Sequence, residues 1–136
     1  MERLREIGFT KVGRWFLIED RIDYLLTEAI GANILYAFIS NETVLYVGKS
    51  TRPLGSRLNN YKYAHSSQLT NVRNNKYINE YLRKDIPVDI YALENKKNIK
   101  YGVFTLNIAA GLEDSIIKIV DPIWNNNKIE RNTTSK

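Results

Sequence analysis

Residues 34–50 contain two tyrosines whose phenol groups could take part in a chemical reaction. Tyr36 and Tyr46 each lie in an apolar, β-rich run, and the polar residues 40–42 separate the two runs. This pattern is typical of a β-hairpin. Both runs are nearly continuous in apolar residues, so we expect both faces of the hairpin to be covered.

Cations and a third phenol follow this hairpin closely. Pro53 is a favoured first residue of a helix, and Arg57 and Tyr61, four residues apart, share one face of that helix. Lys49 stands at the end of the second run. The hairpin and helix would therefore bring phenols, an arginine and a lysine together, which are groups that bind phosphate.

The two strand tyrosines must lie on one face of the sheet if both act. A three-residue loop, Ser40 to Glu42, would pair Tyr36 directly with Tyr46. A phenol has a pKa near 10, so a tyrosine acts as a base only where cations such as Lys49 lower that value. We expect Tyr46 to act as a general base on a reacting water molecule and Tyr36 to orient that water. The alternative is that both tyrosines only fill the sheet.

Glu113 is a carboxylate on the apolar side of a predicted helix over residues 108–120. It precedes Ile116, Ile117 and Val120 at helical spacing. A carboxylate at such a position is costly unless it binds a cation or several donors. We expect it to bind Mg²⁺ or Mn²⁺, since Mg²⁺ takes one or two carboxylates and keeps several waters. The alternative is a buried ion pair with Arg57.

A second polar cluster lies at the start of a helix predicted from Thr70 or Asn71 to about Lys84. Its side chains are of the types that read bases or contact phosphates. We therefore predict DNA contacts here, with an ordinary polar helix start as the alternative. The residues are Asn71, Arg73, Asn74 and Lys76.

Composition favours a single domain without disulfides or a membrane span. The chain has 136 residues, no cysteine, one histidine and a formal net charge of +5. No apolar run approaches the roughly 18 residues of a membrane helix, so we expect a cytoplasmic protein with no membrane partner. The net positive charge suits a polyanion such as DNA.

The remaining elements complete an α/β (α+β) pattern. Residues 9–18 and 88–93 read as strands, and residues 19–30 have apolar residues at helical spacing. We divide the chain into an N-terminal extension (1–32), a core domain (33–126) and a polar tail (127–136). The extension would pack on the core or form an oligomer interface.

The order of these residues resembles the GIY-YIG nuclease family, named for two tyrosine triplets on neighbouring strands. The triplets are Ile34-Leu35-Tyr36, without the leading glycine, and Tyr46-Val47-Gly48. The resemblance covers about residues 33–126 and is closest to the family's small phage endonucleases and restriction enzymes. The positions that match the family's functional residues are Tyr36, Tyr46, Arg57, Tyr61, Glu113 and Asn125.

The resemblance implies a three-stranded, mainly antiparallel sheet flanked by helices. It implies a Mg²⁺-dependent endonuclease that cuts DNA, in which Arg57 holds the scissile phosphate and Tyr61 contacts that phosphate or the leaving oxygen. Asn125 would pin the helix end or the Glu113 side chain, or else be a loop turn residue.

Other functions and an assembly remain open at this point. The alternatives are a catalytically decayed nucleic-acid-binding module, a repair or single-strand-specific nuclease, and a structural domain that binds a partner through its sheet. Because one such site cuts one strand at a time, we also predict a homodimer or higher even oligomer. The predicted N-terminal helix, Ile22 to Ile30, would join the subunits.

Overall fold

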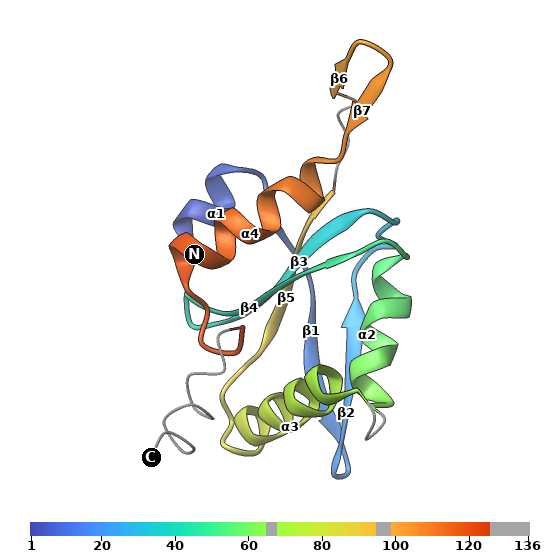
Figure 1. The fold of residues 1–136 in the computed structure, drawn as a ribbon. Helices are drawn as coiled ribbons and strands as arrows, with labels where there is room; N and C mark the ends of the chain where they lie inside the picture. The colour runs from blue at the N-terminus through green and yellow to red at the C-terminus, as the bar shows by residue number, and fades with distance from the viewer. Residues whose placement is uncertain (65–67, 95–98, 126–136) are drawn as a thin grey trace.

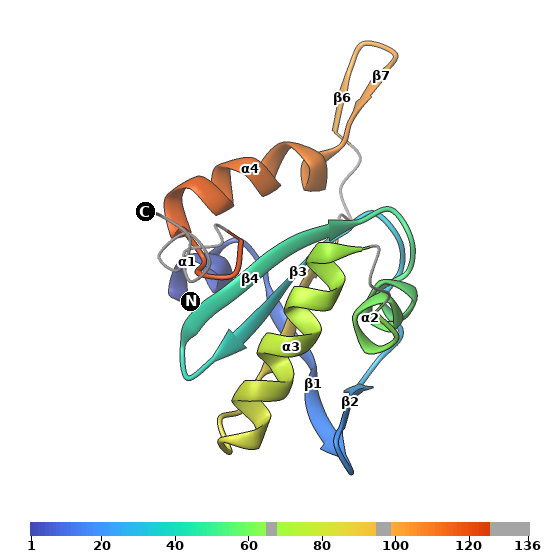
Figure 2. The ribbon, with the colours of Figure 1, turned by 60° about the horizontal axis from the view of Figure 1, so that its bottom comes forward.

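Helices cover both faces of an antiparallel sheet of five strands (Figures 1 and 2). The computed structural model describes residues 1–64, 68–94 and 99–125, so the predicted tail at 127–136 lies outside the described residues. In chain order the elements are α1 (Glu2–Glu6), β1 (Thr10–Ile18), β2 (Arg21–Leu26), β3 (Ile34–Ser40), β4 (Thr43–Ser50), α2 (Leu54–Lys62), α3 (Leu69–Arg83), β5 (Asp89–Glu94), β6 (Ile99–Tyr101), β7 (Phe104–Leu106) and α4 (Ile108–Val120).

The strands of the main sheet lie in the order β2-β1-β5-β3-β4, and each pair of neighbours is antiparallel. The predicted hairpin is present as β3 and β4, and the strand predicted at 88–93 is β5. The predicted α+β class is therefore confirmed. The sheet is two strands wider than the three expected, because the predicted N-terminal extension supplies β1 and β2. The division at residue 32 stays a prediction, although β1 pairs directly with β5 of the core.

The helix predicted over residues 19–30 is wrong, because Arg21–Leu26 forms β2. Ile22, Tyr24 and Leu26 fit a strand's two-residue period, just as Ile22, Leu25 and Leu26 fit a helical one. Strand β1 offers β2 a row of backbone partners, from Ile18 opposite Arg21 to Gly13 opposite Leu26. This long ladder of hydrogen bonds decides between two patterns that the sequence supports about equally.

The register of the β3–β4 hairpin differs from the predicted one by two residues. Tyr36 pairs with Gly48, and Phe38 pairs with Tyr46. The loop has two residues instead of three, and Leu45 is an extra residue where the register shifts, which makes a β-bulge. The two loop residues and the extra residue of the bulge together make three, an odd number. Tyr36 and Tyr46 therefore still share one face of the sheet, as predicted.

Alternation along β3 divides the core between the two faces. Tyr36 and Phe38 belong to a cluster with residues of α2 and α3, whereas Leu35 and Ala37 belong to a cluster with residues of α1 and α4. Each face of β3 is therefore covered, which explains its unbroken apolar run. Figure 2 shows α3 crossing the first face and α4 lying on the other side of the sheet.

The helix boundaries agree closely with the sequence patterns. Pro53 is the N-cap of α2, and α4 spans the predicted residues and ends before Pro122. Helix α3 begins slightly earlier than predicted, with Gln68 instead of Thr70 or Asn71 as its N-cap. Since no helix within the described ranges is long and apolar enough, none could cross a membrane.

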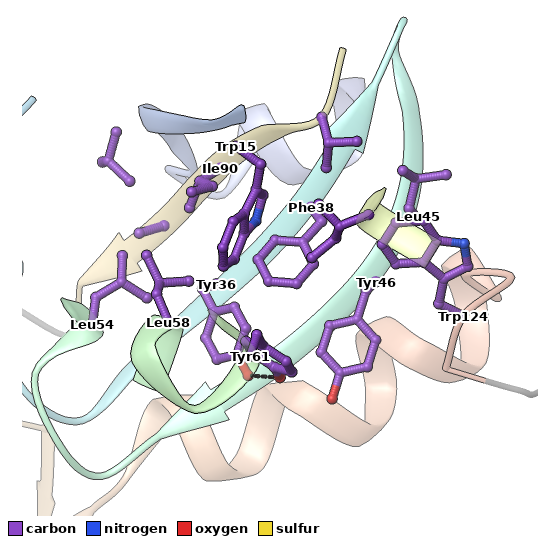
Figure 3. Close-up of a cluster of buried hydrophobic side chains, with 14 of the residues drawn as sticks. Trp15, Tyr36, Phe38, Leu45, Tyr46, Leu54, Leu58, Tyr61, Ile90 and Trp124 are labelled. Carbon is purple, nitrogen blue, oxygen red and sulfur yellow. Dashed lines mark hydrogen bonds between the residues drawn. The ribbon is translucent and has the colours of Figure 1, made fainter. Parts of the chain in front are cut away.

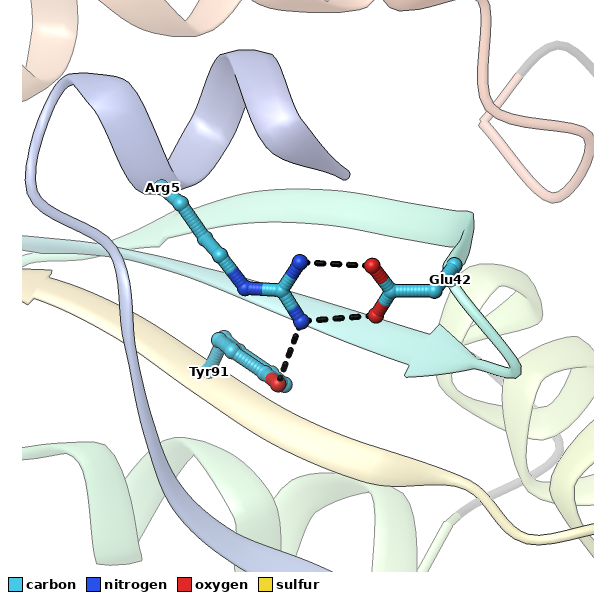
Figure 4. Close-up of polar contacts among 3 residues, drawn as sticks. All are labelled: Arg5, Glu42 and Tyr91. Atoms are coloured by element: carbon cyan, nitrogen blue, oxygen red, sulfur yellow. Dashed lines mark hydrogen bonds and ion pairs between the residues drawn. The ribbon is translucent and has the colours of Figure 1, made fainter.

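Two peripheral features complete the fold. Arg5 on α1 donates two hydrogen bonds of 2.6 Å to Glu42 in the β3–β4 turn, and one of 3.4 Å to Tyr91 (Figure 4). This contact holds α1 over the sheet. The β6–β7 hairpin protrudes from the rest of the molecule at the start of α4 (Figure 1).

Candidate active site

Three tyrosine rings gather around one phenylalanine on the face of the sheet that α2 and α3 cover. The ring of Phe38 lies 5.7 Å from those of Tyr36 and Tyr46 and 5.4 Å from that of Tyr61, measured between centroids. The three phenol oxygens lie at the same end of this cluster (Figure 3). The predicted meeting of two strand tyrosines with the helix tyrosine is therefore present.

The hydroxyl groups of Tyr36 and Tyr61 share a hydrogen bond of 2.5 Å. Gly48 makes room for it, because a Cβ at this position would lie only 2.6 Å from the Cζ and hydroxyl oxygen of Tyr36. The glycine of the second triplet therefore lets the Tyr36 ring lie across the backbone of β4.

Burial raises the pKa values of Tyr36 and Tyr61 well above the ordinary phenol value. The positive charge of Arg57 acts in the opposite direction on both groups and does not outweigh burial. Both hydroxyls therefore stay protonated at neutral pH and can donate hydrogen bonds, but neither is suited to accept a proton as a base.

Arg57 on α2 lies against this group of phenols. Its Cζ lies 4.5 Å from the centroid of the Tyr61 ring, and its Nη1 donates a 3.0 Å hydrogen bond to Oδ1 of Asn71 on α3. Burial acts to lower the pKa of Arg57, but the oxygens of Tyr36 and Tyr61 outweigh it and the pKa is raised. Arg57 is thus a permanent, half-buried cation held by an aromatic ring and an amide.

Glu113 lies on the other side of β4, where α4 packs. Its side chain is 17% exposed and lies 3.7 Å from Nζ of Lys49, measured from Oε1. The alternative prediction, an ion pair between Glu113 and Arg57, is therefore wrong, because the partner of Glu113 is Lys49. Burial raises the pKa of Glu113 despite the nearby lysine, so this carboxylate is incompletely compensated.

A metal site here would depend on one carboxylate. No cluster of three or more His, Cys, Asp or Glu side chains occurs within the described part of the chain. A single, mostly buried carboxylate still fits Mg²⁺, which commonly keeps several waters, and a cation would offset the cost of burying Glu113.

Asn125 binds the edge of β4 and not the Glu113 side chain. Its Oδ1 accepts a 2.7 Å hydrogen bond from the Val47 amide, and its Nδ2 donates one of 2.7 Å to the Val47 carbonyl. The neighbouring Trp124 amide donates to the Leu45 carbonyl at 2.9 Å. This segment completes an otherwise open sheet edge, and it steadies the strand that carries Tyr46 and Lys49.

Comparison with known proteins identifies the architecture. No protein-family model and no curated protein sequence matches the chain. A solved structure of a bacteriophage T4 EndoII mutant matches with a TM-score of 0.71 and 24% identity, covering 91% of this chain and 95% of that chain. The restriction endonuclease HPY188I, solved in complex with product DNA, matches with a TM-score of 0.52 and 16% identity, covering 93% and 80%. The chain has the nuclease fold that these two proteins share. The fold predicted from the GIY-YIG resemblance is therefore confirmed.

Within this fold, the predicted DNA-binding cluster on α3 divides into two parts. Asn71 is 6% exposed and Asn74 is fully buried, so neither side chain is accessible for DNA in this conformation. They face inward because α3 packs this side onto the sheet. Arg73 is partly exposed and Lys76 is exposed, and contact of these two with DNA stays a prediction.

Sequence reasoning missed two side chains that build the site. Phe38 lies between the site tyrosines, and its position two residues after Tyr36 on the same strand was the available signal. Tyr24 on β2 binds α2 through its hydroxyl, which lies 2.7 Å from Oδ1 of Asn59 and 3.1 Å from the Gly55 carbonyl. No local pattern indicated that Tyr24 contacts α2, because residues 19–30 were predicted to be a helix.

Proposed function

We propose that this protein is a Mg²⁺-dependent DNA endonuclease that hydrolyses phosphodiester bonds by direct attack of water. One observation carries the proposal: Arg57 is half-buried, permanently charged, stacked on Tyr61 and tied to Asn71 beside the Tyr36–Tyr61 hydroxyl pair. A cation and neutral donors at one end of a rigid cluster suit a phosphate whose charge grows in the transition state.

Each residue of the cluster has a distinct role in the proposed reaction. The guanidinium of Arg57 binds the scissile phosphate, because a planar fork matches its oxygens. Tyr61 donates to the same phosphate or to the leaving oxygen once bound DNA uncovers its hydroxyl, because its side chain is fully buried in this structure. Tyr46 acts in its deprotonated form and takes the proton that the attacking water loses, while the bond from phosphorus to the leaving oxygen breaks. The leaving oxygen then gains a proton from solvent water. Tyr36, which is fully buried and shares a hydrogen bond with Tyr61, keeps this group in position. It orients the water once the same change uncovers its hydroxyl.

Glu113 is the proposed ligand of Mg²⁺ or Mn²⁺. The ion would polarise the phosphate oxygens and stabilise their charge. Lys49, 3.7 Å from Glu113, adds positive charge beside the same carboxylate. Lys49 lies on β4, the strand that also carries Tyr46, and Glu113 lies on α4 beside it. Asn125 holds that strand by its Val47 peptide.

DNA is the proposed substrate and partner. Proteins of this fold include an endonuclease solved with product DNA, and the chain's net charge of +5 suits a polyanion. We propose an activity like that of phage or restriction endonucleases in a cytoplasmic setting.

A nicking assay on supercoiled plasmid tests the proposal. The wild-type protein should convert the plasmid to nicked or linear forms with Mg²⁺ and not with a chelator. Glu113→Gln should abolish cleavage and still retain DNA in a gel-shift assay, whereas Asp114→Asn, the exposed neighbour on α4, should cleave at the wild-type rate. Binding without cleavage by the wild-type protein under all metal conditions would indicate a nucleic-acid-binding module instead.

A further inference from the structure

Arg57 is oriented by a chain of amide side chains from α3. Its Nη1 donates to Oδ1 of Asn71 at 3.0 Å, and Nδ2 of Asn71 donates to Oε1 of Gln68 at 2.7 Å. Because a guanidinium has only donors, Asn71 must face it with its oxygen, and this turns the Asn71 amino group towards Gln68. The charge of Arg57 therefore determines the direction of both hydrogen bonds.

Burial makes this arrangement rigid. Asn71 is 6% exposed, so its amide cannot exchange these partners for bulk water without cost. The Tyr61 ring restrains the same guanidinium from α2, with Cζ 4.5 Å from the ring centroid. Tyr61 on α2 and Asn71 on α3 thus both contact the Arg57 guanidinium, and together they limit how it can turn.

We propose that Asn71 is a positioning residue that aims the Arg57 guanidinium, and that Gln68 supports it by holding the Asn71 amide. This inference rests on the proposed function, in which Arg57 binds the scissile phosphate. It replaces the predicted direct contact between Asn71 and DNA. A fixed guanidinium needs no reorientation in the transition state, so losing its restraint lowers the rate of the chemical step more than the affinity for DNA.

The test compares Asn71→Leu with a matched control on the same helix. Asn75 also joins α3 to α2, but it does so through the backbone carbonyl of Tyr61, to which its Nδ2 donates a 2.7 Å hydrogen bond. Asn71→Leu should lower kcat at least about ten-fold and change KM less than about three-fold, whereas Asn75→Leu should affect kcat far less. Asn71→Asp, which keeps an acceptor oxygen, should recover part of the loss. A raised KM with unchanged kcat, or equal effects of the two leucine variants, would overturn the inference.

A second readout does not depend on cleavage. In ¹⁵N NMR spectra, the Arg57 side-chain signal, assigned by its loss in Arg57→Lys, should show faster guanidinium rotation in Asn71→Leu than in the wild type or Asn75→Leu. Unchanged rotation would contradict the positioning role even if the enzyme is active. If the wild-type protein cleaves no DNA, the proposed function fails while this measurement still decides whether Asn71 restrains Arg57.

Discussion

Glu113 is a carboxylate whose ionisation the folded state opposes. Burial raises its pKa above the ordinary value although Lys49 lies nearby. A raised pKa means that the folded protein holds the proton more tightly than the unfolded chain does. The resulting advantage is present in acid and is lost as the pH rises through the two pKa values.

The neutral variant Glu113→Gln should therefore be more stable than the wild type at neutral pH in metal-free buffer. The difference should disappear below the ordinary carboxyl pKa, where the wild-type group is also uncharged. Urea unfolding at neutral and acidic pH measures this, and added Mg²⁺ should stabilise only the wild type. Asp114→Asn serves as the control, and a Glu113→Gln variant less stable at neutral pH would contradict the prediction.

Replacing Arg57 with lysine should impair cleavage, although lysine carries the same positive charge. We expect Arg57→Ala to lose several orders of magnitude in cleavage rate and Arg57→Lys to recover only part, because an ammonium group cannot reproduce the planar fork or its stacking on Tyr61. Single-turnover cleavage measures both variants. Full activity of the lysine variant would mean that Arg57 contributes only its charge.

Substitutions of the two strand tyrosines should have different effects, one mainly on turnover and the other mainly on stability. Tyr46→Phe should reduce turnover more than Tyr36→Phe, because Tyr46 is the proposed base. Tyr36→Phe should be the more destabilising change, by about 1 kcal/mol or more, since it leaves the buried Tyr61 hydroxyl without its partner. Turnover and urea unfolding of both variants check this, and the opposite order in turnover would exchange the two roles.

At the scale of elements, β2 supports the helix that carries Arg57 and Tyr61. The Tyr24 hydroxyl binds Asn59 and Gly55 of α2, and Asp23 forms a 2.9 Å ion pair with Lys62 at the end of the helix. The N-terminal hairpin is thus a brace for the helix of the candidate active site as well as an extension of the sheet.

Tyr24→Phe should therefore lower both stability, by about 1 kcal/mol, and the rate of cleavage. Tyr91→Phe is the matched control, because Tyr91 is also a partly buried strand tyrosine but its hydroxyl contacts Arg5 on the opposite face (Figure 4). Thermal unfolding and plasmid nicking measure both variants. Equal losses of activity in the two variants would contradict the role of β2 as a brace.

At the scale of the whole molecule, the predicted homodimer loses its expected surface, because residues 22–30 form no helix. The dimer itself stays a prediction. Large exposed apolar side chains instead gather on the protruding β6–β7 hairpin, where Val103 is 87% and Phe104 is 75% exposed. Exposed apolar groups of this kind favour association, and a two-stranded hairpin cannot bury its own faces.

We therefore expect an even oligomer whose contacts include this hairpin. Sedimentation at micromolar protein should show association in the wild type, loss of association after Val103→Ser with Phe104→Ser, and no change after Leu25→Ser on β2. A wild-type protein that sediments as a monomer, or a double variant that still associates, would contradict this expectation.

The sequence by itself determined the elements whose patterns are local. The β3–β4 hairpin, the helix after Pro53 and α4 with its end before Pro122 follow from apolar periodicity and from the backbone limits of proline. The types of side chain in the candidate site were equally readable, because Arg57, Tyr61 and Glu113 lie at helical spacings that show which face each one occupies.

Only the tertiary structure decided how distant segments pair. The strand at residues 21–26 and the bulge that offsets Tyr46 from Tyr36 depend on which register the neighbouring strand offers. The contacts of Asn71 with Arg57 and of Asn125 with Val47 join separate segments of the chain. A hydrogen bond between such segments depends on both partners and on the packing that brings them together. Local spacing contains no record of that packing, which is why candidate residues could be named from the sequence while the partners that they contact could not.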